Sequence, residues 1–421
     1  MSNYLNTKKV VLIQSKYFNF WESLGCGYIG AVAKERHKNL ELSFFQGYFD
    51  SDKEIIESSK DADIIAFSCT SPAYSHALFL AKSIKKLNPN CYTVFGGWHA
   101  SAVPDIVKED VIDSVVVGEG DLVFSEIIEG RREPVIKASP VKDLDSLPFP
   151  DRGLIKNHRE IDLAQKMTGL RMTSFQSMRG CPRSCAFCSE HVVSGKLAKD
   201  NHLRIRSPGN IINEINKVAK DYGLEYFKFV DPTWNISEDK VISFCEEKIR
   251  TGNTLPWECN SHASLVTENM LKAMKEAGCC QINIGCESGS IKILRDMHKG
   301  LTIEHIKKAF ALGRKVGLKR RSFFLLGMPN ETEADIRMTE QLVEEIDPDV
   351  FGITILCPYP GSELFSENLS GVDWSATDEY KNDFWRSKAL SNEQLKYWQN
   401  YLVNKFKDRA CWHNNKIKEE A

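Results

Sequence analysis

The sequence has no apolar run of the ~18 residues that a membrane span needs, and no excess of charge of either sign. Its 421 residues carry 55 Lys and Arg against 57 Asp and Glu, a formal net charge of -2. This balance gives no electrostatic footprint for a nucleic acid or an anionic membrane. The start, "MSNYLNTKKVVLIQ", lacks the apolar segment and cleavage site of a signal peptide. We therefore expect a cytoplasmic protein that binds neither nucleic acid nor membrane.

Internal repeats and low-complexity tracts are also missing, whereas cysteine is plentiful, with 13 residues. A reducing compartment disfavours disulfides, and clustered cysteines there more often bind metal or take part in chemistry. Cys259 and Cys286 precede predicted strand ends, so each is either a small buried residue or a thiol facing a cavity.

Residues 1–137 alternate short apolar runs with amphipathic stretches. The runs, which we predict to be strands, are "KKVVLI", "LELSFFQGYF", "ADIIAFSC", "CYTVFGG" and "DSVVVGEG". Continuous apolar strands separated by helices are typical of a parallel sheet covered on both faces. We predict an α/β fold that begins with a doubly wound, Rossmann-like domain of about five strands.

Three further regions follow that domain. Residues 138–170 contain "ASPVKDLDSLPFPDRGL", whose prolines and charges without periodicity predict a linker. Residues 171–365 contain six β/α units, which indicate a partial (β/α)6 barrel because a closed eight-unit barrel takes ~250 residues. Residues 366–421 are expected to form a short helical C-terminal segment.

Cys181, Cys185 and Cys188 lie close together in "SMRGCPRSCAFCSEH", with the spacing C-x3-C-x2-C. They follow the first predicted barrel strand, at the end where barrel enzymes keep their chemistry. Three thiolates can hold three irons of a four-iron, four-sulfur cluster and leave the fourth iron open to a substrate-like molecule. The alternative is a zinc site completed by His191, although structural zinc loops rarely cap the first strand of a barrel.

The run "RGCPRSCAFC" resembles the signature of the radical S-adenosylmethionine (SAM) superfamily, and the resemblance extends over about residues 171–363. It implies that the three cysteines hold a 4Fe-4S cluster whose open iron chelates SAM, and that an electron from an external donor of flavodoxin or ferredoxin type produces a 5'-deoxyadenosyl radical. "FKFVDPTWN" and "INIGCESGS" are similar to supporting segments of that family. Asp231 can also be an ordinary turn residue, and Glu287 a structural ion pair. The residues implied to contact SAM are Phe187, Asp231, Glu287 and Ser288.

The predicted strands of the first domain end in "SCTSPAY", "FGGWHAS" and "VGEGD". Glycines there let a flat or extended ligand approach the backbone, and turn amides suit phosphate groups. No G-x-G-x-x-G follows the first strand, which weakens a dinucleotide interpretation and leaves a nucleotide, a flavin or a cobalamin tail. The candidate binding residues are Ser68, Thr70, Ser71, Gly96, Gly97, Trp98, His99, Gly118, Glu119 and Gly120.

The two domains together resemble the cobalamin-dependent radical SAM class, because "GGWHASAVP", "DSVVVGEGD" and "LDSLPFPDR" are similar to that class's usual run. The resemblance implies that the first domain binds cobalamin. The Asp-x-His-x-x-Gly loop of classical cobalamin modules is missing, which implies a cobalt without a protein histidine below it. Thr70 to Tyr74 is our candidate for the lower face of the corrin, and we expect His99 to bond to backbone or to the cofactor tail.

The resemblance implies a class B-type radical SAM methyltransferase that methylates an unactivated sp3 carbon. Methylcobalamin would supply the methyl group, and the 5'-deoxyadenosyl radical would remove a hydrogen atom. We expect a peptide or protein side chain as the substrate, for example a glutamine of methyl-coenzyme M reductase. One alternative keeps both cofactors but catalyses a rearrangement, cyclisation or oxidation. Another, from a different class, is a zinc-bearing binding or sensor protein.

Overall fold

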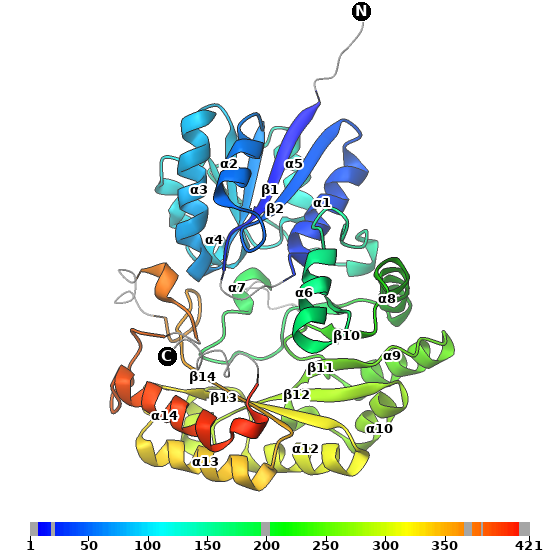
Figure 1. The fold of residues 1–421 in the computed structure, drawn as a ribbon, viewed down its shortest axis with the longest axis vertical. Coiled ribbons are helices and arrows are strands. Elements are labelled where there is room, and N and C mark those ends of the chain that lie inside the picture. The colour runs from blue at the N-terminus through cyan, green and yellow to red at the C-terminus, as the bar shows by residue number, and fades with distance from the viewer. Residues whose placement is uncertain (1–6, 18–21, 195–202, 366–372, 380–381, 412–421) are drawn as a thin grey trace, which may run out of the picture. The chain divides into compact units, whose positions relative to one another are not determined.

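The structure, a computed structural model of the chain, describes residues 7–17, 22–194, 203–365, 373–379 and 382–411. It divides into two compact units (Figure 1). The first unit comprises residues 1–167, 189–204 and 372–375, and the second comprises 168–188, 205–371 and 376–421. In the described part of the chain, no helix combines the length and the apolar character that a membrane crossing requires.

The first unit is built on a sheet of six parallel strands in the order β2-β1-β3-β4-β5-β6. The sixth strand was not predicted, since three residues are too few to show a pattern. The strand order reverses between β1 and β3, and such a reversal opens a ligand crevice at the carboxyl edge of a sheet. The strands are β1 (Lys8–Gln14), β2 (Leu40–Gln46), β3 (Ile64–Ser68), β4 (Tyr92–Gly96), β5 (Ser114–Val117) and β6 (Val135–Lys137).

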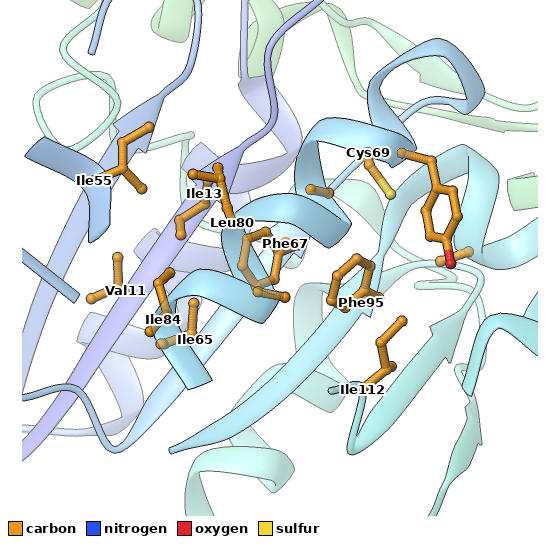
Figure 2. Packing of buried hydrophobic residues seen from close by; sticks show 14 of the residues in the cluster. Val11, Ile13, Ile55, Ile65, Phe67, Cys69, Leu80, Ile84, Phe95 and Ile112 are labelled. Carbon is orange, nitrogen blue, oxygen red and sulfur yellow. The ribbon is translucent and has the colours of Figure 1, made fainter. Parts of the chain in front are cut away.

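Helices cover both faces of this sheet, which explains why its strands read as continuous apolar runs. One face packs against α2 (Asp52–Ser59), α3 (Tyr74–Leu87) and α4 (Gly97–Ala102). The other face packs against α1 (Leu24–Arg36) and α5 (Gly120–Glu129). Figure 2 shows the first of these cores, where strand side chains meet those of α3. Its labelled members include Ile13, Ile65, Phe67, Leu80, Ile84 and Phe95.

The segment expected to be a linker, residues 138–170, is largely part of the first unit. It contains helix α6 (His158–Thr168), and its side chains at Val141, Leu144 and Leu147 are buried against α1. This segment is therefore packed against the first unit and is not a free linker, because Val141, Leu144 and Leu147 face the unit instead of solvent.

The second unit is a partial barrel of six parallel strands in the order β14-β13-β12-β11-β10-β7, as the sequence predicted. The six strands are β7 (Met172–Phe175), β10 (Tyr226–Phe229), β11 (Trp257–Ser261), β12 (Cys279–Glu287), β13 (Lys319–Leu326) and β14 (Val350–Ile355). The helices between them are α8 (Pro208–Tyr222), α9 (Glu238–Arg250), α10 (Glu268–Glu276), α11 (Ile291–Asp296), α12 (Ile303–Val316) and α13 (Glu333–Ile346). Four of them begin after a Ser or Thr whose side chain accepts from the first turn, at Ser207, Ser237, Thr267 and Thr302. Such caps satisfy amides that a helix start leaves unbonded.

Alternation along the strands separates an apolar outer face from a polar inner face. Phe229 and Trp257 pack against Phe244 of α9, with ring centroids 5.3 and 5.5 Å away. Successive strand residues point to opposite faces, so Glu258 and Asn260 lie on the inner face. At β11 and the neighbouring β12 the inner face therefore carries hydrogen-bonding groups.

The C-terminal region is less helical than expected. Its main helix is α14 (Asn392–Lys405), while residues 382–391 have no helix, and residues 366–372 and 412–421 lie outside the described parts. The helix lies along the edge strand of the barrel, where Gln399 Nε2 donates to Ile353 O at 3.2 Å. Residues 372–375 belong to the first unit, although their chain neighbours belong to the second.

Candidate functional site

The three clustered cysteines occupy a loop that follows β7 and the short strand β8 (Met178–Arg179). The side chains of Cys181, Cys185 and Cys188 are all half-buried. The loop is tied down by its backbone, because Cys188 N donates to Cys185 O and Ala186 N donates to Met297 O, both at 3.0 Å. A loop held at its middle presents its thiols from fixed positions.

Phe187, implied by the resemblance to contact SAM, lies half-buried in the turn between the second and third cysteines. The side chain of His191, the fourth ligand of the zinc alternative, lies outside the described residues. Among the described residues, no three His, Cys, Asp or Glu side chains converge as the ligands of a single metal ion do. The following helix, α7 (His191–Ser194), belongs to the first unit.

Asp231, implied by the resemblance to contact SAM, binds the chain segment that leads into the cysteine loop. Its carboxylate accepts from Ser177 N at 3.0 Å, Ser177 Oγ at 2.8 Å and Met178 N at 2.8 Å. The side chain is 1% exposed, and burial raises its pKa to about 6. Both carboxylate oxygens are engaged by the segment that leads into Cys181, so the structure uses this residue to position the loop.

Glu287 ends β12 in a left-handed backbone conformation, with φ of 62°. Its carboxylate forms a buried ion pair with Lys299, whose ammonium also donates to Gly285 O at 2.8 Å. A Cβ on Gly285 would overlap both charged groups, so the absence of a side chain there makes room for the pair. The sequence alternative of a structural ion pair is thus what the described residues contain.

Ser288, the neighbour of Glu287, is fully buried. Its hydroxyl accepts from Ser290 N at 3.1 Å and lies 3.4 Å from Thr339 Oγ1. Its hydroxyl is therefore engaged within the turn after β12 and against α13.

The candidate binding residues of the first unit gather at the carboxyl ends of β3, β4 and β5. Gly97 has φ of 88°, and a Cβ there would lie 3.0 Å from Cys69 O. Cys69 O accepts from His99 N at 3.2 Å, and Gly118 N donates to Ser101 Oγ at 3.1 Å. These short approaches bring the turns after β3 and β4 into direct contact. Trp98 is 38% exposed beside them.

His99 is fully enclosed at this edge, with no exposed surface. Its Nδ1 lies 3.0 Å from Ser71 Oγ, and its ring lies 4.4 Å from Tyr74 and 5.0 Å from Trp374. Burial lowers the pKa of His99 to about 4, so the imidazole is neutral near pH 7. Two buried polar atoms here, His99 Nε2 and Thr70 Oγ1, have no hydrogen-bond partner within the described residues.

Glu119 is held by an arginine and does not stand open at the sheet edge. Arg204 Nη1 and Nη2 donate to its carboxylate at 2.8 and 2.5 Å, and Val141 N donates to it at 3.0 Å. The side chain of Glu119 is 4% exposed and that of Arg204 is 9% exposed. The pair fixes the segment that follows the cysteine loop onto the first unit, a role that no local pattern around Glu119 indicates.

Several residues of these sites carried no signal in the sequence. Lys299 lies in the polar turn "MHKG", and Thr233 in the turn after β10 has its hydroxyl 3.6 Å from Cys181 Sγ. Neither residue belongs to a spacing or an apolar pattern, because its role depends on a segment far away in the chain. Cys259 and Cys286 are both fully buried, as their small-residue interpretation expected.

The comparisons with known proteins match both units. The family model for the radical SAM superfamily matches residues 175–343, and the model for the B12 binding domain matches residues 10–128. An uncharacterized methyltransferase of Pyrococcus horikoshii, PH0819, is 28% identical over 366 residues, covering 81% of this chain and 77% of its own. The anaerobic magnesium-protoporphyrin IX monomethyl ester cyclase of Rubrivivax gelatinosus is 28% identical over 377 residues, covering 82% and 66%.

Solved structures with the same fold contain both kinds of unit. The radical SAM methyltransferase TsrM from Kitasatospora setae, with cobalamin and a [4Fe-4S] cluster bound, has a TM-score of 0.69 and 17% identity, covering 87% of this chain and 76% of that one. The cobalamin-dependent radical SAM enzyme OxsB, with aqua-cobalamin and SAM bound, has a TM-score of 0.65 and 16% identity, covering 97% and 63%. The chain thus carries a B12-binding domain and a radical SAM domain, the pair of domains that cobalamin-dependent radical SAM enzymes combine, and its cofactors are a 4Fe-4S cluster, SAM and cobalamin.

Proposed function

We propose that this enzyme transfers a methyl group from SAM to an unactivated carbon of its substrate. The observation that carries the proposal is the presence, in one chain, of a three-thiol loop at barrel strand ends and a glycine-edged ligand site on a B12-binding unit. Relatives named as methyltransferases support it, including the Pyrococcus protein and a cytidylyl-2-hydroxyethylphosphonate methyltransferase of Streptomyces wedmorensis that is 25% identical over 423 residues.

The described residues fit the cluster. Cys181, Cys185 and Cys188 place three half-buried thiols within one tethered loop, and thiolates are the ligands that such clusters use. Burial raises the pKa of the Cys185 thiol to about 11, and the nearby ammonium of Lys299 offsets part of that rise. A positive group beside a ligating sulfur favours the thiolate form.

The described residues also fit a ligand with an extended polar tail on the first unit. A Cβ at Gly97 would crowd the backbone of Cys69, so the glycine allows the turns after β3 and β4 to meet closely around the enclosed His99. His99 Nε2 and Thr70 Oγ1 are buried polar atoms that find no hydrogen-bond partner in the described parts of the chain, and such atoms normally have one in a complete site. The neutral, enclosed His99 suits hydrogen bonding to a cofactor tail, which is one of the two roles that the sequence suggests for it.

The protein's contribution is to hold and shield these groups, since the cofactors supply hydrogen-atom removal and methyl transfer when bound. Asp231 fixes the strand end from which the cysteine loop departs. The buried pair of Glu287 and Lys299 places one charge of each sign over the bare backbone of Gly285, inside the barrel. We propose that this pair lies beside SAM and orients it.

We further propose that the substrate is polar, with a peptide or protein side chain as the favoured case and a flavodoxin- or ferredoxin-type protein as electron donor. The inner face of the barrel supports a polar substrate. Gln281 Nε2 donates to Glu258 Oε2 at 3.1 Å, and Asn283 Nδ2 donates to Glu258 Oε1 at 3.3 Å. A lipid-binding cavity would instead need an apolar lining. Methylation of a glutamine in methyl-coenzyme M reductase is one reaction of this class.

The proposal is tested with reconstituted enzyme and SAM that carries a trideuterated methyl group. The enzyme is incubated with a reductant and with the peptide, protein and lipid fractions of the source cells, and each fraction is analysed by mass spectrometry. We expect a mass gain in the peptide or protein fraction, together with S-adenosylhomocysteine and 5'-deoxyadenosine. Label in the lipid fraction alone would contradict the substrate class.

The cyclase relatives make a non-methylating reaction the second candidate. At 28% identity the Rubrivivax cyclase is as similar to this chain as the Pyrococcus methyltransferase is. Formation of 5'-deoxyadenosine without S-adenosylhomocysteine, and with no deuterium in any product, would favour this second candidate over methyl transfer.

A further inference from the structure

We propose that Thr233 is a positioning residue that donates a hydrogen bond to the sulfur of Cys181 and thereby raises the reduction potential of the cluster. The inference rests on the cluster assignment and is independent of whether the reaction transfers a methyl group.

The contact is short and shielded from water. Thr233 Oγ1 lies 3.6 Å from Cys181 Sγ, within hydrogen-bond range of a sulfur acceptor, and the threonine is 5% exposed. A cysteine that ligates a metal is deprotonated, so its sulfur has no proton to donate. The hydroxyl of Thr233 must then be the donor in the loaded enzyme.

Both sides of the contact are held by the same framework. The turn that carries Thr233 is fixed to β11, because Asn260 Nδ2 donates to Asp231 O at 3.1 Å and Trp234 N donates to Asn260 O at 2.9 Å. The carboxylate of Asp231 holds Ser177 and Met178, which lead into Cys181. These bonds hold the backbone segments that carry the hydroxyl and the sulfur close to each other.

A hydrogen bond to a ligating sulfur acts on the cluster's electron affinity. Reduction adds negative charge that spreads onto the sulfur ligands, and a donor stabilises that charge more than it stabilises the oxidised state. Hydrogen bonds to the sulfurs are among the factors that set cluster potentials. Thr233 should therefore make the cluster easier for an external donor to reduce.

The experiment compares reconstituted full-length wild type with Thr233→Val, which has the same shape but no hydroxyl, and with Thr233→Ser, which restores it. Midpoint potentials are measured by redox titration followed by electron paramagnetic resonance, without SAM or substrate. We expect Thr233→Val to reduce the equilibrium constant for reduction about tenfold, which is about 59 mV for one electron. Thr233→Ser should keep the wild-type potential.

A matched control is Thr339→Val, which removes a fully buried hydroxyl that bonds to backbone groups in the same unit. The control should leave the potential unchanged. An unchanged potential in Thr233→Val with four irons bound would overturn the proposal. If that variant does not retain its iron, Thr233→Ala takes its place, and a potential equal to that of Thr233→Ser would be equally decisive against it.

Discussion

Replacing Glu119 by glutamine tests whether this residue acts through Arg204 or through a ligand. The substitution keeps the shape of the side chain and removes its charge. In the structure that charge meets both terminal nitrogens of Arg204, at 2.8 and 2.5 Å, and the two side chains are almost fully enclosed. Glu119→Gln leaves a buried guanidinium without its counter-charge.

The expected loss is large. Removing one member of a buried ion pair costs about 3–5 kcal/mol, because the remaining charge stays desolvated. For a unit of this size, each kcal/mol shifts the midpoint of thermal unfolding by ~2–4 °C, so a decrease of roughly 6–20 °C is expected. The effect should appear in protein without cofactors, since the pair needs no ligand.

The matched control is Glu214→Gln, which breaks a second buried pair, with Arg206 Nη1 at 2.5 Å from the carboxylate. Thermal unfolding and hydrogen exchange of both variants are measured without cofactors. Both should lose stability, but only Glu119→Gln should speed exchange near Val141 and in α7. A Glu119→Gln protein with unchanged unfolding and weaker cobalamin binding would show that the carboxylate acts on the ligand and that our reasoning is wrong.

Four further outcomes are expected. Gly285→Ala should displace the ion pair of Glu287 and cost about 1–3 kcal/mol by overpacking, with slower SAM cleavage by the reconstituted enzyme; wild-type unfolding and rates would contradict the steric argument. Burial raises the pKa of Glu331 from 4.5 to about 8, so the unfolded state loses its proton first and stability should fall, by at most about 5 kcal/mol, as the pH rises through that window. Urea unfolding of Glu331→Gln should lack this decline, and a parallel decline in both proteins would refute the assignment. Asp231→Ala should lower the iron bound after reconstitution, because two backbone amides lose their acceptor, whereas full iron content would remove its positioning role. Cobalamin bound to the enzyme should show no nitrogen coupling from His99 by electron paramagnetic resonance, and such a coupling would reverse our interpretation of that histidine.

The sequence predicted those features that depend on local pattern. The three cysteines share one loop and were recognised by spacing, and the strands of both units were recognised by apolar runs. Strand β6 was missed because three residues show no period. Residues 138–170 were predicted to be a linker because the prolines of this segment are visible in the sequence. The surface of the first unit that buries Val141 and Leu147 is not visible there.

The roles of individual side chains were harder to predict, because they depend on distant partners. The sequence resemblance implied that Asp231 contacts SAM. In the structure its carboxylate accepts hydrogen bonds from two backbone amides that lie 53 and 54 positions earlier in the chain. Glu119 pairs with an arginine 85 positions later. Residue type and position at a strand end indicate that a side chain could take part in chemistry. Only the folded chain shows which other protein groups already bond to that side chain.

The division of the first unit into three chain segments has a consequence for its synthesis. Once residue 167 has been translated, the sheet and most helices of the first unit are present. Arg204 and Trp374 belong to the same unit but are translated later. At ~5–20 residues per second, the roughly 200 residues between 167 and Trp374 take about 10–40 s to translate. During that interval Glu119 first lacks its arginine, and the ring of His99 lacks its indole neighbour until the end. The newly made unit must therefore persist as an unfinished intermediate while the whole barrel is being translated.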